Sequence, residues 1–126
     1  MKIAYVDTSC LVAVALGERG AAAVERRLAR FDRLVSSNLL EAELRAALRR
    51  EGVEGASRVL SSITWLLPDR PLSAEIAAVL EAGYVRGADC WHLATALYLA
   101  PEPSELSFMT LDERQRDVAA LLGFGA

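Results

Sequence analysis

Several residue types are scarce in this 126-residue sequence, and each scarcity excludes a class of protein. Two cysteines and one histidine are too few for a disulfide scaffold or for a soft-metal site, which needs several thiols or imidazoles at ligand spacing. No apolar run approaches the roughly 18 residues of a membrane span, and the chain begins with a strand pattern in place of a signal peptide. We therefore expect a cytoplasmic protein whose cysteines are reduced.

Lysine is nearly absent, and the net charge is mildly acidic. Lys2 is the only lysine, so the other cations are arginines, and the formal net charge is −3. This balance argues against a simple basic groove for nucleic acid. Arginine nevertheless suits bidentate phosphate contacts, and the alternative interpretation is a set of solvated charges on helix faces.

The composition and periodicity predict one compact domain over residues 1–126. Hydrophobic residues make up 53% and charged residues 25% of the chain. The pattern predicts strands at residues 3–6, 33–37, 66–73 and 105–110, the third at a sheet edge because of its prolines. It predicts helices at residues 8–17, 18–31, 37–51, 53–67, 73–87, 88–100 and 112–124. This alternation indicates a three-layer α/β/α domain with a central parallel sheet of four or five strands.

Helix caps are expected at two polar pairs. Thr8 or Ser9 would cap the first helix, and Ser37 or Asn38 would cap the helix over residues 37–51.

Two acidic residues come where predicted strands end. Asp7 directly follows the strand over residues 3–6, and Asp112 follows the strand over residues 105–110. Ligands of open parallel sheets bind outside the carboxyl ends of the strands. We therefore expect both carboxylates at the same sheet edge, although Asp is also a common helix cap.

Two further acids lie on predicted helices. Glu43 borders the apolar face that contains Leu40 and Leu44, and Glu41 points to a different face, so at most one of the two reaches a common site. Asp89 stands at the start of a largely apolar helix, where an N-cap role would also explain it. Each acid, taken singly, has an ordinary structural explanation.

The histidine and the cysteines lie close to these acids in sequence. His92 follows Asp89 by almost one helical turn; a packed or capping histidine is favoured over a general base. Cys10 and Cys90 follow Asp7 and Asp89, so the two cysteines could approach each other near the site as small core residues.

Further candidate binding residues have equally plain explanations. Three arginines on the Glu43 helix would either meet the phosphates of a nucleic acid or form a solvated face: Arg45, Arg49 and Arg50. Three aromatic residues are favoured as core or subunit interface over base-stacking platforms: Trp65, Trp91 and Tyr98.

Four motifs in order, VDTS, AEL, ADCWHLATA and TLDE, resemble the PIN-domain family, most closely the toxin ribonucleases of type II, VapBC-like toxin–antitoxin systems. The resemblance covers essentially the whole chain, including SSNLLEAEL and the final LGF. The sequence departs from the family at its short C-terminus, where GFGA leaves little for the last strand.

This resemblance implies a metal-dependent endoribonuclease. The family's catalytic and metal-binding acids fall on four positions of this chain: Asp7, Glu43, Asp89 and Asp112. Its supporting polar residues fall on Thr8, Ser9 and Thr110. Mg²⁺ or Mn²⁺ is the expected ion, because hard cations prefer oxygen ligands. We expect Asp7 and Asp89 to hold it most directly, Glu43 to act as ligand or water-orienting base, and Asp112 to act through water.

The resemblance also implies partners: a cognate antitoxin, an RNA substrate and a second copy in a homodimer. A catalytically silent PIN-fold module that binds RNA or protein is the alternative. Two other enzyme classes fit poorly. A receiver-type phosphoacceptor needs a lysine near its acids, and Lys2 lies at the wrong end of its strand; a haloacid-dehalogenase-like phosphatase needs Asp where Ser9 stands.

Overall fold

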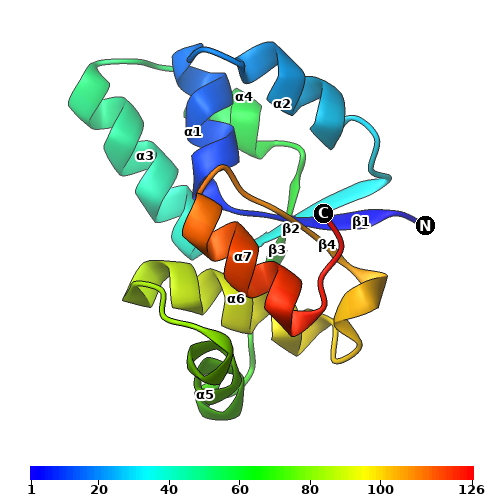
Figure 1. Cartoon of the computed structure of the whole chain (residues 1–126). Helices are drawn as coiled ribbons and strands as arrows, with labels where there is room; N and C mark the ends of the chain where they lie inside the picture. The colour runs from blue at the N-terminus through cyan, green and yellow to red at the C-terminus, as the bar shows by residue number, and fades with distance from the viewer.

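The structure, a computed structural model, describes residues 1–126 and contains a parallel sheet between two layers of helices (Figure 1). The strands lie in the order β3-β2-β1-β4: β1 (Ile3–Val6), β2 (Arg33–Ser37), β3 (Ile63–Leu66) and β4 (Ser107–Met109). The helices are α1 (Thr8–Leu16), α2 (Ala21–Leu28), α3 (Leu39–Glu51), α4 (Ala56–Leu60), α5 (Ser73–Ala82), α6 (Gly87–Leu99) and α7 (Glu113–Leu122), with a 3₁₀ turn at Pro103–Glu105. The predicted α/β/α class and parallel sheet are confirmed.

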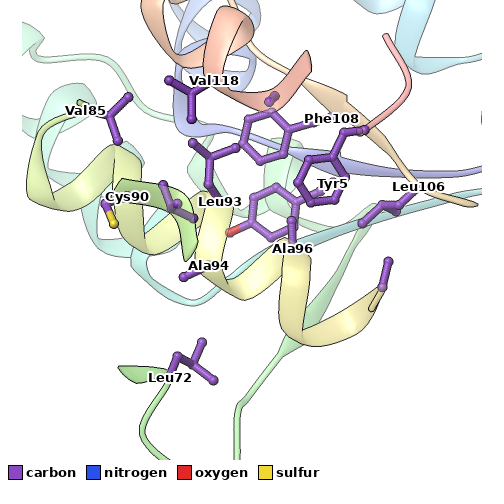
Figure 2. Close-up of a cluster of buried hydrophobic side chains, with 14 of the residues drawn as sticks. Tyr5, Leu72, Val85, Cys90, Leu93, Ala94, Ala96, Leu106, Phe108 and Val118 are labelled. Carbon is purple, nitrogen blue, oxygen red and sulfur yellow. The ribbon is translucent and has the colours of Figure 1, made fainter. Parts of the chain in front are cut away.

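Strand β1 is buried on both faces because each face of the sheet has its own core. Ala4 and Val6 belong to a cluster beneath α1 to α4, and Tyr5 between them belongs to a cluster beneath α5 to α7 (Figure 1). Figure 2 shows Tyr5 and Phe108 in this second cluster, where their rings stack with centroids 5.2 Å apart. The alternation follows from the period of two along a strand.

The position of β1 also creates the sheet's crevice. The chain adds β2 and then β3 on one side of β1, and β4 returns to pair with its other side. Val6 is in register with Met109, and the Asp7 N–H donates to the Met109 carbonyl at 2.9 Å. The residues that follow β1 and β4 therefore leave the sheet together at its carboxyl edge, where ligands of such sheets bind.

The prediction for residues 53–73 was wrong. The predicted helix over residues 53–67 is divided into the five-residue α4 and strand β3, and the predicted edge strand at residues 66–73 is mostly a loop before α5. The edge strand is β3, whose Ile63–Leu66 segment pairs with β2. Its β-branched and aromatic residues favour a strand, whereas a helical spacing of apolar residues had suggested otherwise.

The cap position agrees with the prediction at α3 and differs from it at α1. Asp7, and neither Thr8 nor Ser9, caps α1, because its carboxylate accepts from the Ser9 N–H at 3.1 Å. Asn38 occupies the cap position of α3 without a capping bond, while the Ser37 hydroxyl accepts from the N–H of Leu39.

The predicted ends of several helices were also wrong. Helix α2 begins only at Ala21, because the chain first turns through left-handed conformations at Gly17 (φ 63°) and Gly20 (φ 87°). Helix α5 ends at Ala82, and Gly87 is the first residue of α6 where a break was predicted.

The short C-terminus extends the sheet by a single bridge. Gly125 pairs in parallel with Ser107, since its N–H donates to the Leu106 carbonyl at 3.0 Å and its carbonyl accepts from Phe108 at 2.9 Å. A fifth strand is thus present only as one bridged residue. None of the helices combines the length and apolar character needed to cross a membrane.

Candidate active site

Asp7 lies at the centre of the crevice, where β1 ends. Its side chain is buried, and one oxygen, Oδ2, accepts from the Ser9 N–H at 3.1 Å and lies 3.3 Å from the Thr110 hydroxyl oxygen. The other oxygen, Oδ1, accepts from the Gln115 amide at 3.3 Å. A strand therefore ends here on a carboxylate because that group both caps α1 and is held by donors from the β4–α7 segment.

Gln115 links the acids to one another, and it was not among the predicted site residues. It is fully buried, and its Nε2 donates to Asp7 Oδ1 and to the Asp89 carbonyl, each at 3.3 Å. Its Oε1 accepts from the Thr110 hydroxyl at 2.6 Å, and its backbone N–H donates to Asp112 at 2.7 Å. One side chain and its backbone thus touch three of the four predicted acidic residues.

The sequence contained one pattern that includes Gln115, but this pattern predicts a different role for the residue. Asp112 caps α7, and a Gln three residues after an N-cap is the capping-box pattern, in which the Gln reaches back to the cap's N–H. Here the Asp112 N–H donates to Thr110 instead, which frees Gln115 for Asp7. Only the tertiary structure reveals this diversion.

Glu43 meets the crevice from α3, through Thr8 and His92. Its Oε1 accepts from the Thr8 hydroxyl at 2.7 Å and lies 3.0 Å from His92 Nε2. The His92 hydrogen bond, followed by the Thr8 bond, lowers the pKa of Glu43 although burial opposes the shift. Glu41, the alternative, instead binds Arg45 and Asn38 on the surface. Of the two glutamates, only Glu43 reaches the candidate site.

Asp89 lies in the first turn of α6, beside the other acids. It is the third helical residue and Arg86 holds the cap position, so the alternative explanation of Asp89 as an N-cap is wrong. Burial, and then the negative charges of Asp7 and Asp112, raise the pKa of Asp89. Arg86 Nε, 3.7 Å from the Asp89 carboxylate, offsets this in part. The charge coupling shows that these three carboxylates share one electrostatic environment.

The predicted supporting residues all lie against the acids. Thr110 donates to Gln115 and lies within 3.3 Å of Asp7, and the Ser9 hydroxyl accepts from the N–H of Leu111 at 3.0 Å. Ser9 and Thr110 hydroxyl oxygens are 3.4 Å apart, so α1 and the end of β4 are joined across the crevice.

The acids of the site offer the kind of ligand atom that a hard cation prefers, but their carboxylates do not converge on one point. No group of three or more His, Cys, Asp or Glu side chains converges closely enough in this structure to hold a metal ion. The acids nevertheless supply only oxygen ligands, which hard cations prefer. The raised pKa of Asp89 also reflects a repulsion that a cation would relieve.

Other predicted residues lie away from this site. Cys10 packs beneath α1 to α4 and Cys90 beneath α5 to α7, on opposite faces of the sheet, so the prediction that they could approach each other was wrong. Burial raises the pKa of both thiols, that of Cys10 to about 12.

The three arginines of α3 are exposed. Arg45 pairs with Glu41 and Arg50 with Glu51, and no ion pair involves Arg49. A role in RNA binding stays a prediction.

The three aromatic residues are half-buried, and two of them make hydrogen bonds. Trp91 donates to the Ser37 hydroxyl at 2.9 Å, and Tyr98 donates to Asp69 at 3.1 Å. Trp65 packs against the core beneath α1 to α4. These contacts agree with packing roles.

Comparison with known proteins identifies the family. The family described as PIN domain matches residues 4–121, a range that contains all four acids. The chain is also similar to Ribonuclease VapC46 of Mycobacterium tuberculosis (strain ATCC 25618 / H37Rv), with 33% identity over 126 residues that cover 98% of this chain and 95% of the relative. With both matches running through nearly its entire length, the chain belongs to the PIN-domain family.

Proposed function

We propose that this protein is a metal-dependent endoribonuclease and the toxin of a toxin–antitoxin pair. The observation that carries the proposal is the Gln115 and His92 network, which ties Asp7, Glu43, Asp89 and Asp112 to one sheet edge. Family membership and the similarity to a ribonuclease support the same activity.

The acids differ in how much of each is free for a ligand. Asp7 is fixed by donors to both of its oxygens, and Glu43 has one oxygen engaged and one without a protein partner. Asp89 is half-buried and electrostatically disfavoured in its charged form. We therefore assign Asp7 and Asp89 as the main ligands of Mg²⁺ or Mn²⁺, with Glu43 as a ligand or water-orienting base and Asp112 acting through water.

The other residues of the site hold the acids and the RNA in position. A bound hard cation supplies a water of lowered pKa and charge stabilisation for in-line attack on phosphorus. Gln115 and Thr110 hold Asp7, while Thr8 and His92 hold Glu43. The exposed Arg45, Arg49 and Arg50 of α3 provide phosphate contacts for the RNA.

The partners follow from the toxin role. We propose a cognate antitoxin that covers the acidic crevice, with a basic side chain meeting its carboxylates. We also propose a homodimer and a cytoplasmic location, where RNA substrates are found.

The test is cleavage of a mixed cellular RNA pool by the purified protein. Reactions contain Mg²⁺, Mn²⁺ or a chelator, with Asp7→Asn and Asp89→Asn in parallel. Asp69→Asn is the matched control, because Asp69 is an exposed carboxylate bonded to Tyr98. We expect discrete products with either metal, none with chelator or with the two site variants, and unchanged cleavage by the control.

A different outcome would identify the alternative function. Folded, antitoxin-free protein that binds RNA but yields no products with either ion would overturn the enzyme assignment. The chain would then be a silent PIN-fold binding module.

A further inference from the structure

A chain of hydrogen bonds runs from the backbone of β2 to Glu43. The Ser37 N–H donates to the Tyr5 hydroxyl at 3.1 Å, and that hydroxyl lies 2.6 Å from His92 Nδ1. The other ring nitrogen, Nε2, lies 3.0 Å from Glu43 Oε1. His92 and Tyr5 are each at most 1% exposed, so water does not compete for these bonds.

The direction of the first bonds follows from the chemistry of the phenol. Burial raises the pKa of Tyr5 far above its ordinary value, so the hydroxyl keeps its proton. Its oxygen already accepts from the Ser37 N–H, and the proton is therefore available to His92 Nδ1. A ring nitrogen that accepts from Tyr5 leaves the hydrogen of the neutral imidazole on Nε2.

The surroundings of Nε2 require the same arrangement. A carboxylate only accepts, and Glu43 Oε1 is the nearest atom to Nε2. The Thr8 hydroxyl, 3.2 Å away, directs its own hydrogen to Glu43 at 2.7 Å. An Nε2 without hydrogen would face the lone pairs of both groups.

We propose that His92 is a positioning residue, whose Nε2–H, fixed by the Tyr5 hydroxyl on the opposite ring nitrogen, holds Glu43 so that Oε2 alone faces the ligand. Together with Thr8, His92 saturates Oε1, while Oε2 makes no hydrogen bond within the chain. This inference rests on the proposed function in giving Glu43 a ligand or water to orient. It assigns Tyr5 and His92 roles beyond core packing.

The first test is spectroscopic and needs no activity. His92 is the only histidine, so a long-range ¹H–¹⁵N correlation spectrum contains a single imidazole. Near neutral pH and in chelator, we expect a protonated Nε2 and an Nδ1 resonance shifted by an accepted hydrogen bond. Tyr5→Phe should return the Nδ1 resonance to that of an unbonded acceptor. An unprotonated Nε2 in the wild type, or an Nδ1 signal indifferent to Tyr5→Phe, would overturn the proposal.

A matched control isolates the hydroxyl of Tyr5. Tyr98→Phe removes a hydroxyl from the same helix as His92, where it binds Asp69 at the surface. This variant should leave the imidazole spectrum unchanged.

The second test separates positioning from packing by rescue. His92→Gln can place an amide N–H near the site of Nε2, whereas His92→Leu fills the cavity without a donor. We expect His92→Leu to lower kcat about 10- to 100-fold with little change in KM for RNA, as loss of a ligand's supporting hydrogen bond does elsewhere. His92→Gln should recover most of the rate. Equal loss in both variants at equal thermal stability would indicate packing alone.

The two hypotheses fail in different ways. A wild type that cleaves no RNA refutes the ribonuclease, but the imidazole spectrum still decides whether His92 holds Glu43. A cleaving wild type with the wrong tautomer retains the ribonuclease and refutes the positioning role.

Discussion

Replacing Gln115 with leucine is the most direct perturbation of the site's architecture. Leucine has a similar size but no polar atoms, so Gln115→Leu removes three side-chain hydrogen bonds at a fully buried position. Two are donated by Nε2, to Asp7 and to the Asp89 carbonyl, and one is accepted from Thr110.

The expected cost can be worked from these bonds. A hydrogen bond to a charged group contributes about 1.5–3 kcal/mol, and a buried acceptor left without a donor costs about 1–3 kcal/mol. Asp7 retains its donor from Ser9, and the Thr110 hydroxyl, released from Gln115, can turn to Asp7, 3.3 Å away. We therefore expect a net loss of about 3 kcal/mol in the free energy of unfolding, which lowers Tm by about 10 °C in a chain of this length.

The assay is urea denaturation in the presence of a chelator, followed by circular dichroism. Asn38→Ala serves as the control, because it removes an amide that binds Glu41 on the exposed surface. The control should change the midpoint little. RNA cleavage by Gln115→Leu should fall as well, since Asp7 and Asp89 lose their shared tether.

A variant of the same shape tests whether the donor beside Asp7 stabilises the protein. Gln115→Glu keeps the size but replaces the donor with a carboxyl beside Asp7. That carboxyl should have a folded pKa above the unfolded value of about 4.3. The penalty should therefore be small below about pH 4 and grow as pH rises through the folded pKa. If Gln115→Leu unfolds within about 0.5 kcal/mol of the wild type, the reasoning that these bonds hold the site is refuted.

Three further predictions follow from single positions. Asp112→Asn should keep the α7 cap and the stability of the protein but reduce RNA cleavage. Asp112→Ala should reduce cleavage and also lower the free energy of unfolding by about 1 kcal/mol. Urea denaturation of both variants would detect this difference, and equal stability would contradict the capping role. The raised folded pKa of Asp89, caused first by burial and then by Asp7 and Asp112, means that the contribution of Asp89 to wild-type stability in chelator should fall as pH rises from about 4 through that pKa. The stability difference between the wild type and Asp89→Asn should therefore fall over this range in the same titration, and a constant difference would show that Asp89 makes no such contribution. Gly83→Ala should lower Tm, because the added Cβ would lie 3.0 Å from a Val118 methyl in the core. The free energy of unfolding should fall by about 1 kcal/mol. An unchanged Tm would mean that Val118 moves aside freely.

The alternating pattern of the sequence predicted the α/β/α class correctly for a physical reason. Short segments such as the apolar Ile3–Val6 and the β-branched, partly polar Arg33–Ser37 suit strands of a covered parallel sheet, and the intervening segments have helical spacing. The prediction failed around Ile63–Leu66, where local periodicity suited a helix. Pairing with β2 decided the outcome there, because strand formation depends on partners that are distant in sequence.

The candidate site divides in the same way. The four acids were predicted from the motifs shared with the family, and the rule on strand ends predicted that two of them, Asp7 and Asp112, lie at one sheet edge. The identity of their partners did not. The sequence placed His92 beside Asp89, but its bonds are to Tyr5, 87 residues away, and to Glu43, 49 residues away.

The sequence by itself determined the fold class, the family and the choice of candidate acidic residues, because periodicity and ordered motifs are local properties of the chain. Only the tertiary structure decided that Gln115 and His92 connect those acids, and that Cys10 and Cys90 lie on opposite faces of the sheet. The physical reason is that hydrogen bonds depend on distance and direction in space. These are set by sheet order and helix packing, and no sequence spacing encodes them.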